Sequence, residues 1–180
     1  MKPTVYIETT IPSLLTAWPN RDVEIAAQQI ATREWWQQRR QAFDLYGSQE
    51  VLKEAARGDA DAARDRLAAL AECRILAATD MAESGTERIL STGLIPAPAA
   101  SDAVPIGYAA AHGMDFLLTW NCRHILNAVI QRRLAGVRVR GAGFQCPQRV
   151  QEEANPADLT FYRVEEVWSP FSYAKRVVDC

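Results

Sequence analysis

TVYIE, residues 4–8, is the stretch of sequence that decides the fold. Its β-branched and aromatic residues predict a buried strand that stops at the acidic Glu8. A second apolar run, FLLTW at residues 116–120, stops in the same way at Asn121. Ligands of open α/β sheets gather outside the carboxyl ends of the strands. We therefore expect Glu8 and Asn121 to face one shared cleft.

Strand-like and helix-like segments alternate along most of the chain. Besides the two strands above, the pattern predicts strands at 43–46, 74–78 and 137–140, with helices between them. The longest predicted helix, residues 21–40, carries one apolar stripe made of Val23, Ala26, Ala27 and Ile30. This alternation predicts the α/β class, as a three-layer α/β/α sandwich with a parallel sheet of about five strands.

The size of the chain fits one main domain followed by a tail. A chain of 180 residues with 48% hydrophobic content can bury the core of one medium-sized domain. We place that domain at residues 1–144. The tail, residues 145–180, holds many aromatic side chains, which need a surface to cover, either on this domain or on a second chain.

Composition narrows the classes of function. A formal net charge of −2 gives no overall basic field that would attract nucleic acid or an acidic membrane. No apolar run is long enough to span a bilayer, the start of the chain has no secretory leader, and the four cysteines show no CxxC spacing. We expect a cytoplasmic protein with reduced thiols and without a membrane partner.

Arginine is concentrated in one segment. Residues 121–150 contain no Asp or Glu but six arginines, which are Arg123, Arg132, Arg133, Arg138, Arg140 and Arg149. The segment is as compatible with a phosphate-binding patch as with the solvated faces of a helix and an edge strand.

Three acidic residues and one amide are candidates for a metal site. Glu8 ends the first strand, Glu54 lies in the helix after the second, and Asp102 begins the helix that precedes Asn121. Carboxylate and amide oxygens are the ligands that Mg²⁺ and Mn²⁺ prefer, and such ions can activate water for phosphodiester hydrolysis. Each residue also has an ordinary structural interpretation: a cap for Glu8 or Asp102, an ion pair with Arg57 for Glu54, and a turn for Asn121.

Two neighbours modify the picture around Asp102. Pro105 removes the amide that an N-capping Asp102 would bond, so we expect its carboxylate to stay available to a metal. The only histidines, His112 and His124, are expected to have structural or peripheral roles, with His124 a candidate phosphate contact.

Four segments together resemble a known family. They are residues 5–13, 48–54 with 57–59, 101–103, and 112–121, and in this order they resemble PIN-domain proteins, most closely the VapC-like toxins of type II toxin–antitoxin pairs. The likeness spans roughly residues 3–144.

The resemblance implies a parallel sheet between helices, an acidic cleft that binds Mg²⁺ or Mn²⁺, endoribonuclease activity, restraint by an antitoxin, and a homodimer. By position, Glu8 replaces the usual first aspartate, Glu54 is the helix acid, Asp102 is the third acid, and Asn121 stands where a further aspartate is common. The candidate RNA contacts are Thr9, Arg123 and His124.

The sequence departs from the family pattern at several positions, and Asn121, Pro105 and the divergent aromatic tail favour an alternative. Glu8 is one methylene longer than aspartate, Asn121 carries no charge, Pro105 stands where a histidine is expected, and Gly107 weakens the helix. The alternative hypothesis is therefore a degenerate PIN-like module that binds RNA or protein without cutting.

Overall fold

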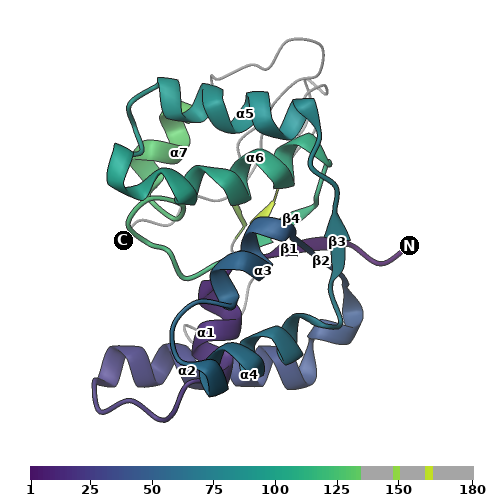
Figure 1. Cartoon of the computed structure of the whole chain (residues 1–180), viewed down its shortest axis with the longest axis vertical. Helices are drawn as coiled ribbons and strands as arrows, with labels where there is room; N and C mark the ends of the chain where they lie inside the picture. The colour runs from purple at the N-terminus through teal and green to yellow at the C-terminus, as the bar shows by residue number, and fades with distance from the viewer. Residues whose placement is uncertain (135–147, 151–160, 164–180) are drawn as a thin grey trace.

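The computed structural model describes residues 1–134, 148–150 and 161–163, which form an α/β structure (Figure 1). Its strands are β1 (Thr4–Ile7), β2 (Asp44–Ser48), β3 (Arg74–Leu76), β4 (Phe116–Leu118), β5 (Gln148–Val150) and β6 (Phe161–Arg163). Its α-helices are α1 (Thr10–Thr16), α2 (Val23–Gln38), α3 (Gln49–Ala55), α4 (Ala60–Leu70), α5 (Asp80–Ser91), α6 (Ala103–Ala111) and α7 (Ala128–Leu134). Two 3-10 turns, Arg40–Ala42 and Ala97–Asp102, precede β2 and α6.

The sheet has the strand order β3-β2-β1-β4-β6-β5. The first four strands in this order run parallel, while β6 is antiparallel to both β4 and β5. Four predicted strands and their parallel pairing are thus confirmed, but the described sheet has six strands rather than five and is not parallel throughout. The two antiparallel strands come from the predicted tail, and the predicted strand at 137–140 lies outside the described residues.

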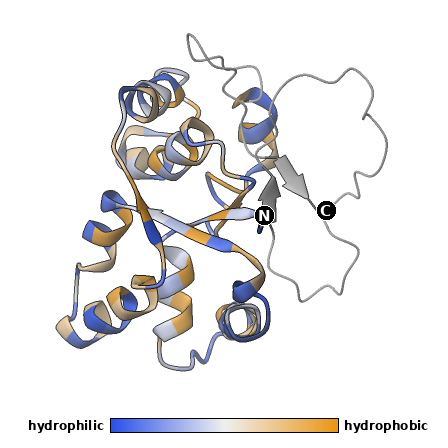
Figure 2. Ribbon diagram, turned by 90° about the vertical axis from the view of Figure 1, so that its right-hand side faces the viewer, coloured by the Kyte–Doolittle hydropathy of each residue, from blue (hydrophilic) through white to orange (hydrophobic). Residues whose placement is uncertain are grey.

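Helices lie on both sides of the strands, as a three-layer arrangement requires. Figures 1 and 2 show α5 and α6 above the sheet and α1, α2 and α4 below it. Side chains at the helix starts fix where several helices begin, because they accept hydrogen bonds from otherwise unpaired amides. Asp22, Ser48, Asp59 and Thr79 cap α2, α3, α4 and α5 in this way. Within the described residues, no helix is long and apolar enough to cross a membrane.

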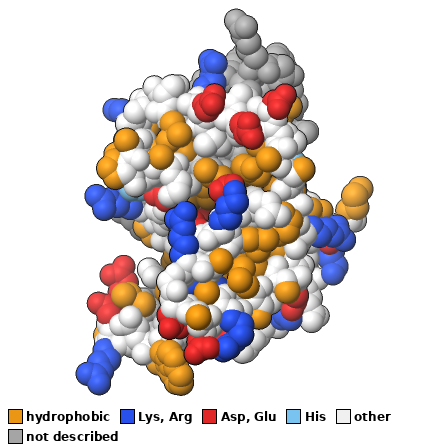
Figure 3. Space-filling view, viewed as in Figure 1, with side chains coloured by type: hydrophobic (Ala, Val, Ile, Leu, Met, Phe, Trp, Pro, Cys, Tyr) orange, Lys and Arg blue, Asp and Glu red, His pale blue; other side chains and the backbone are white. Residues whose placement is uncertain are grey.

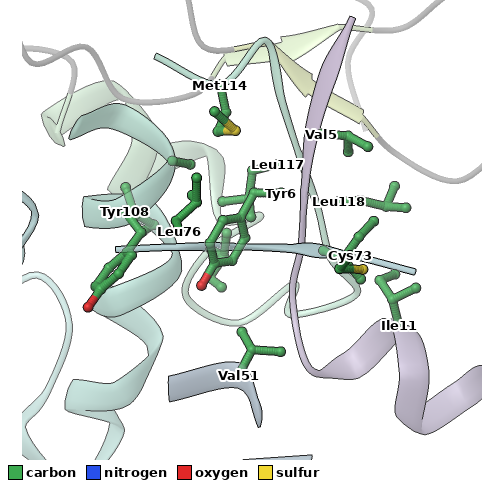
Figure 4. Packing of buried hydrophobic residues seen from close by; sticks show 14 of the residues in the cluster. Val5, Tyr6, Ile11, Val51, Cys73, Leu76, Tyr108, Met114, Leu117 and Leu118 are labelled. Atoms are coloured by element: carbon green, nitrogen blue, oxygen red, sulfur yellow. The ribbon is translucent and has the colours of Figure 1, made fainter. Parts of the chain in front are cut away.

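The core is built on the central strand. Val5, Tyr6 and Ile7 of β1 are completely buried, as are Leu117 and Leu118 of the adjacent β4. Figure 4 shows Val5, Tyr6, Leu117 and Leu118 among the other buried side chains, with Ile11 of α1 and Val51 of α3 nearby. The buried Tyr6 hydroxyl lies 2.7 Å from Ser48 Oγ, which gives both hydroxyl groups a partner, and burial raises the pKa of Tyr6.

Gly107 allows α6 to pack closely on α5. A Cβ atom at this position would lie 2.2 Å from Thr86 Oγ1, 3.0 Å from Thr86 N and 3.1 Å from the carbonyl oxygen of Ala82. The glycine that weakens α6 as an isolated helix therefore has a packing role in the folded protein.

The apolar stripe predicted on α2 faces outward. Val23 is 84% exposed and Ile30 is 56% exposed, so this part of the amphipathic interpretation was wrong. The buried side of α2 carries Gln29, Ala31, Thr32, Trp35 and Trp36 instead.

Candidate functional site

Glu8 lies at the carboxyl end of β1 and is only 6% exposed. Its Oε2 atom accepts three hydrogen bonds, from the amide of Thr10 (3.0 Å), from Thr10 Oγ1, and from Thr119 Oγ1 (2.7 Å). The predicted position of this residue at the end of a buried strand is confirmed. The backbone amide of Glu8 donates to the carbonyl oxygen of Leu118 at 3.1 Å, so this hydrogen bond continues the pairing of β1 with β4 as far as Glu8.

The two threonines that hold Glu8 also join the ends of β1 and β4. Thr10 Oγ1 accepts from the amide of Trp120 at 2.8 Å, and Thr119 Oγ1 accepts from the amide of Asn121 at 2.9 Å. Each hydroxyl thus accepts from the chain leaving β4 and donates to the carboxylate following β1. The sequence interpretation missed both residues, although a hydroxyl beside each strand end was a visible signal.

Glu54 lies next to this group. It is an exposed residue of α3, and its Oε2 accepts from Thr9 Oγ1 at 2.8 Å. Thr9 is buried, so it links the loop after β1 to the predicted helix acid. The alternative ion pair between Glu54 and Arg57 is not among the ion pairs of the described residues.

Burial raises the pKa of Glu8 above its usual range. The hydrogen bonds from Thr10 and Thr119 oppose this shift, while the nearby negative charge of Glu54 adds to it. Within the part of the chain that the structure describes, no Lys, Arg or His forms an ion pair with Glu8 or Glu54. Neither carboxyl group of this pair thus has an ion-pair partner among the described residues.

Asp102 belongs to a second group of polar residues. It begins α6 without making a capping hydrogen bond, as Pro105 predicted. Its carboxylate does not stay available, however, because Oδ2 lies 2.6 Å from His124 Nδ1. The Asp102 and His124 side chains are 23% and 11% exposed. Of the structural or peripheral roles expected for His124, this contact favours the structural one, since His124 is the direct partner of the third predicted acid.

Asn121 connects the two groups. Its side-chain oxygen accepts from the amide of His124 at 3.1 Å, and its own amide donates to Thr119. A continuous path of hydrogen bonds and backbone thus runs from Glu8 through Thr119 and Asn121 to the pair formed by His124 and Asp102. Glu8 and Asn121 follow the carboxyl ends of β1 and β4, whereas Glu54 joins this path through Thr9 from α3 and Asp102 joins it through His124 from the start of α6.

The remaining predicted residues have simpler environments. Arg123 is exposed and follows Asn121 and Cys122 directly, so its side chain is accessible next to the site. His112 Nε2 lies 3.0 Å from the carbonyl oxygen of Ala77, in agreement with a structural role. A cavity of about 310 Å³ lies elsewhere, at the amino ends of β2 and β3, where Asp44 and Arg74 line it. That cavity is not part of the candidate site.

A divalent cation fits one of the two groups better than the other. Glu8 and Glu54 offer hard carboxyl oxygens without an ion-pair partner among the described residues, and oxygen is the ligand type that Mg²⁺ or Mn²⁺ prefers. The carboxylate of Asp102 already has His124 as its partner. Among the described residues, no three His, Cys, Asp or Glu side chains lie close enough together to hold a metal ion. The described acids are therefore not gathered into the three-carboxylate site expected from the sequence, because Glu8 and Glu54 lie in one group and Asp102 lies in another.

Comparisons with family models, with curated proteins and with solved structures find no match to this chain. Function therefore has to be inferred from these residues and their geometry.

Proposed function

We propose that this protein is a metal-dependent endoribonuclease with a PIN-like fold, which hydrolyses RNA phosphodiester bonds with the help of Mg²⁺ or Mn²⁺. The observation that carries the proposal is the buried Glu8 carboxylate beside Glu54, with no described basic partner, at the carboxyl edge of a parallel sheet. Uncompensated carboxylates in this position are characteristic of sites that bind a cation together with a phosphate. A role as the toxin of a toxin–antitoxin pair would follow from the same family resemblance.

In this proposal the site residues have separate roles in metal binding and in positioning. Glu8 and Glu54 would hold the ion, and the threonines fix both carboxylates so that little reorganisation accompanies binding. Once bound, a divalent ion lowers the pKa of a coordinated water and stabilises the leaving oxygen of a phosphodiester. Asn121 and His124 keep Asp102 in place at the rim of the site.

Substrate contacts are proposed for Arg123 and for the free edge of His124. The exposed guanidinium of Arg123 suits the phosphates of an RNA backbone, which supply most of the affinity in such complexes. In Figure 3, Lys and Arg side chains lie across the middle of this face, between α6 above and α3 below.

One observation favours a second function. The bond between Asp102 and His124 removes an acid from the metal site, and no group of three ligands is formed among the described residues. A PIN-like module that binds RNA or protein without cutting would tolerate this arrangement. The two functions differ in whether Mn²⁺ binds.

The test combines cleavage with metal binding. The purified protein is incubated with a tRNA pool in Mn²⁺, in Mg²⁺ and in chelator, and Mn²⁺ binding is measured separately by calorimetry. We expect cleavage only with metal, and a loss of about 10–100-fold in Glu8→Gln and in Asp102→Asn, the second of which breaks the contact with His124 at the rim of the site. Glu87→Gln, which changes an exposed acid on α5 in the same chemical way, should cleave like the wild type.

The outcomes separate the two functions. Cleavage that persists in chelator, or full activity in Glu8→Gln, would refute the metal-dependent nuclease. A folded protein that binds RNA but neither binds Mn²⁺ nor cuts would support the non-catalytic module.

A further inference from the structure

One ring nitrogen of His124 is engaged and the other is open. Nδ1 lies 2.6 Å from Asp102 Oδ2, whereas no described residue forms a hydrogen bond with Nε2. Nε2 is not one of the fully buried polar atoms that lack a partner in the described part of the chain, so it keeps contact with solvent. A bound molecule can therefore reach this nitrogen.

Asp102 determines what Nε2 can do. An ionised carboxylate only accepts hydrogen bonds, so the hydrogen in this contact belongs to Nδ1. In the neutral ring Nε2 then carries a bare lone pair, which accepts a hydrogen bond but cannot donate one. The residue is also held in place, because its side chain is only 11% exposed and its backbone amide donates to Asn121 Oδ1 at 3.1 Å. Nε2 is therefore an oriented acceptor.

This acceptor lies on the segment that links the two groups of the candidate site. Residues 119–124 leave the carboxyl end of β4, and Thr119 at their start donates to Glu8 at 2.7 Å. The exposed Arg123 directly precedes His124. A molecule bound along this segment thus meets a guanidinium group, which only donates, and an imidazole nitrogen, which only accepts.

This combination matches the backbone of RNA. Phosphate oxygens only accept hydrogen bonds, so they suit Arg123 and are repelled by a bare Nε2. Away from the ends of an RNA strand, the ribose 2′-hydroxyl is the only hydrogen-bond donor of the sugar–phosphate backbone, and the backbone of DNA has none. An acceptor beside a phosphate-binding cation can therefore distinguish RNA from DNA.

We propose that His124, oriented by Asp102, accepts a hydrogen bond from a ribose 2′-hydroxyl and so selects RNA over DNA. His124 is then a specificity-determining residue and Asp102 is a positioning residue, which gives this acid a role away from Glu8 and Glu54. The inference rests on RNA as the substrate in the proposed function. It concerns binding alone, so it holds whether or not the bound RNA is cut.

Fluorescence anisotropy with the full chain tests the proposal. Binding is measured in chelator, which prevents metal-dependent cleavage, and at about pH 8, above the usual pKa of histidine. The probes are a short single-stranded RNA, the DNA of the same sequence, and the same RNA with fluorine in place of every 2′-hydroxyl, since fluorine is small but cannot donate. We expect the 2′-fluoro RNA and the DNA to bind about fivefold more weakly than RNA, the loss that one hydrogen bond of about 1 kcal/mol implies.

Two variants assign this preference to the pair. His124→Phe keeps a ring but has no nitrogen, and Asp102→Ala removes the group that fixes the ring hydrogen. Both should bind RNA and 2′-fluoro RNA with affinities that agree within about twofold, a ratio that a purely structural role would not change. The matched control His112→Phe changes the other histidine, whose Nε2 lies 3.0 Å from the carbonyl oxygen of Ala77, and should keep the preference of the wild type. Circular dichroism checks the fold of each variant.

The wild type alone can refute the proposal, because equal binding of RNA and 2′-fluoro RNA overturns it, as does a failure to bind RNA. A preference that persists in folded His124→Phe also overturns it. Cleavage of a tRNA pool in Mn²⁺ is measured separately on the same preparations. Cleavage without a 2′-hydroxyl preference overturns this inference and leaves the nuclease, whereas a preference without cleavage overturns the nuclease and leaves this inference.

Discussion

Gly107→Ala is expected to destabilise the protein, although alanine is the better helix former. The new Cβ would lie 2.2 Å from Thr86 Oγ1, far inside an ordinary carbon–oxygen contact. Thr86 can move this oxygen only by giving up its 2.8 Å hydrogen bond to the carbonyl oxygen of Ala82. The next two neighbours are backbone atoms at 3.0 and 3.1 Å, which no rotamer change can displace, so α5 and α6 must separate slightly.

The magnitude follows from three contributions. Overpacking of a tight contact costs about 1–3 kcal/mol, and loss of the Thr86 hydrogen bond costs about 1 kcal/mol. The higher helix propensity of alanine returns about 1 kcal/mol. We therefore expect a net loss of about 2 kcal/mol in the free energy of unfolding, which corresponds to a decrease of about 4–8 °C in Tm for a chain of this size.

Urea denaturation of four proteins measures the effect. They are the wild type, Gly107→Ala, Thr86→Ala and the double variant, with Gly47→Ala as a control because its Cβ would meet only ordinary contacts, at 3.9 Å or more. Removal of the Thr86 hydroxyl should reduce the cost of Gly107→Ala by at least about 1 kcal/mol. If Gly107→Ala is as stable as the wild type, or costs the same in both backgrounds, the close packing of α5 on α6 is not what holds glycine at this position.

Three further variants test the site and its supports. Because burial raises the pKa of Glu8, the folded state binds this proton more tightly than the unfolded state, so the contribution of Glu8 to stability should be fully present below the usual pKa of 4.5 and be lost as pH rises through the folded value. Glu8→Gln should abolish this fall in urea titrations at several pH values, and an unchanged pH profile would contradict the assignment. Thr32→Val removes the acceptor of the Trp120 indole N–H, at 2.8 Å, and should cost about 1–3 kcal/mol in the same assay; a neutral result would mean that the indole finds another partner. Thr9→Val frees Glu54 and should weaken Mn²⁺ binding in calorimetry by about tenfold, whereas equal affinity would remove Glu54 from the proposed site.

Local signals in the sequence were sufficient to predict much of the fold. The strand at residues 4–7 and the caps at Ser48, Asp59 and Thr79 depend on residue type and spacing within a few positions. The orientation of α2 was not predictable in this way. Periodicity shows which residues share a side of a helix, but only the neighbouring elements determine which side they cover.

In the candidate site too, features set by neighbouring residues were predictable, whereas contacts between residues far apart in the sequence were not. The convergence of Glu8 and Asn121 followed from the general property that parallel strands end at one edge of a sheet. The contact between Asp102 and His124 joins residues 22 positions apart on different elements, and no local pattern encodes it. Pro105 correctly predicted that Asp102 makes no capping hydrogen bond. It could not predict that the Asp102 carboxylate would contact His124 instead.

The threonines make the geometry of the site depend on the pairing of two strands. Ile7 lies opposite Leu118 in the parallel register of β1 and β4, and this register brings Thr119 within 2.7 Å of Glu8. Because side chains alternate between the faces of a sheet, a shift of one residue would place Trp120 where Thr119 lies and would turn Leu118 away from the core. The same pairing that buries Leu117 and Leu118 therefore supplies the hydroxyl that makes a buried carboxylate tolerable. It follows that the position of the Glu8 carboxyl group depends on the pairing of β1 with β4, and that hydroxyl groups, not an ion pair within the described residues, oppose the effect of its burial.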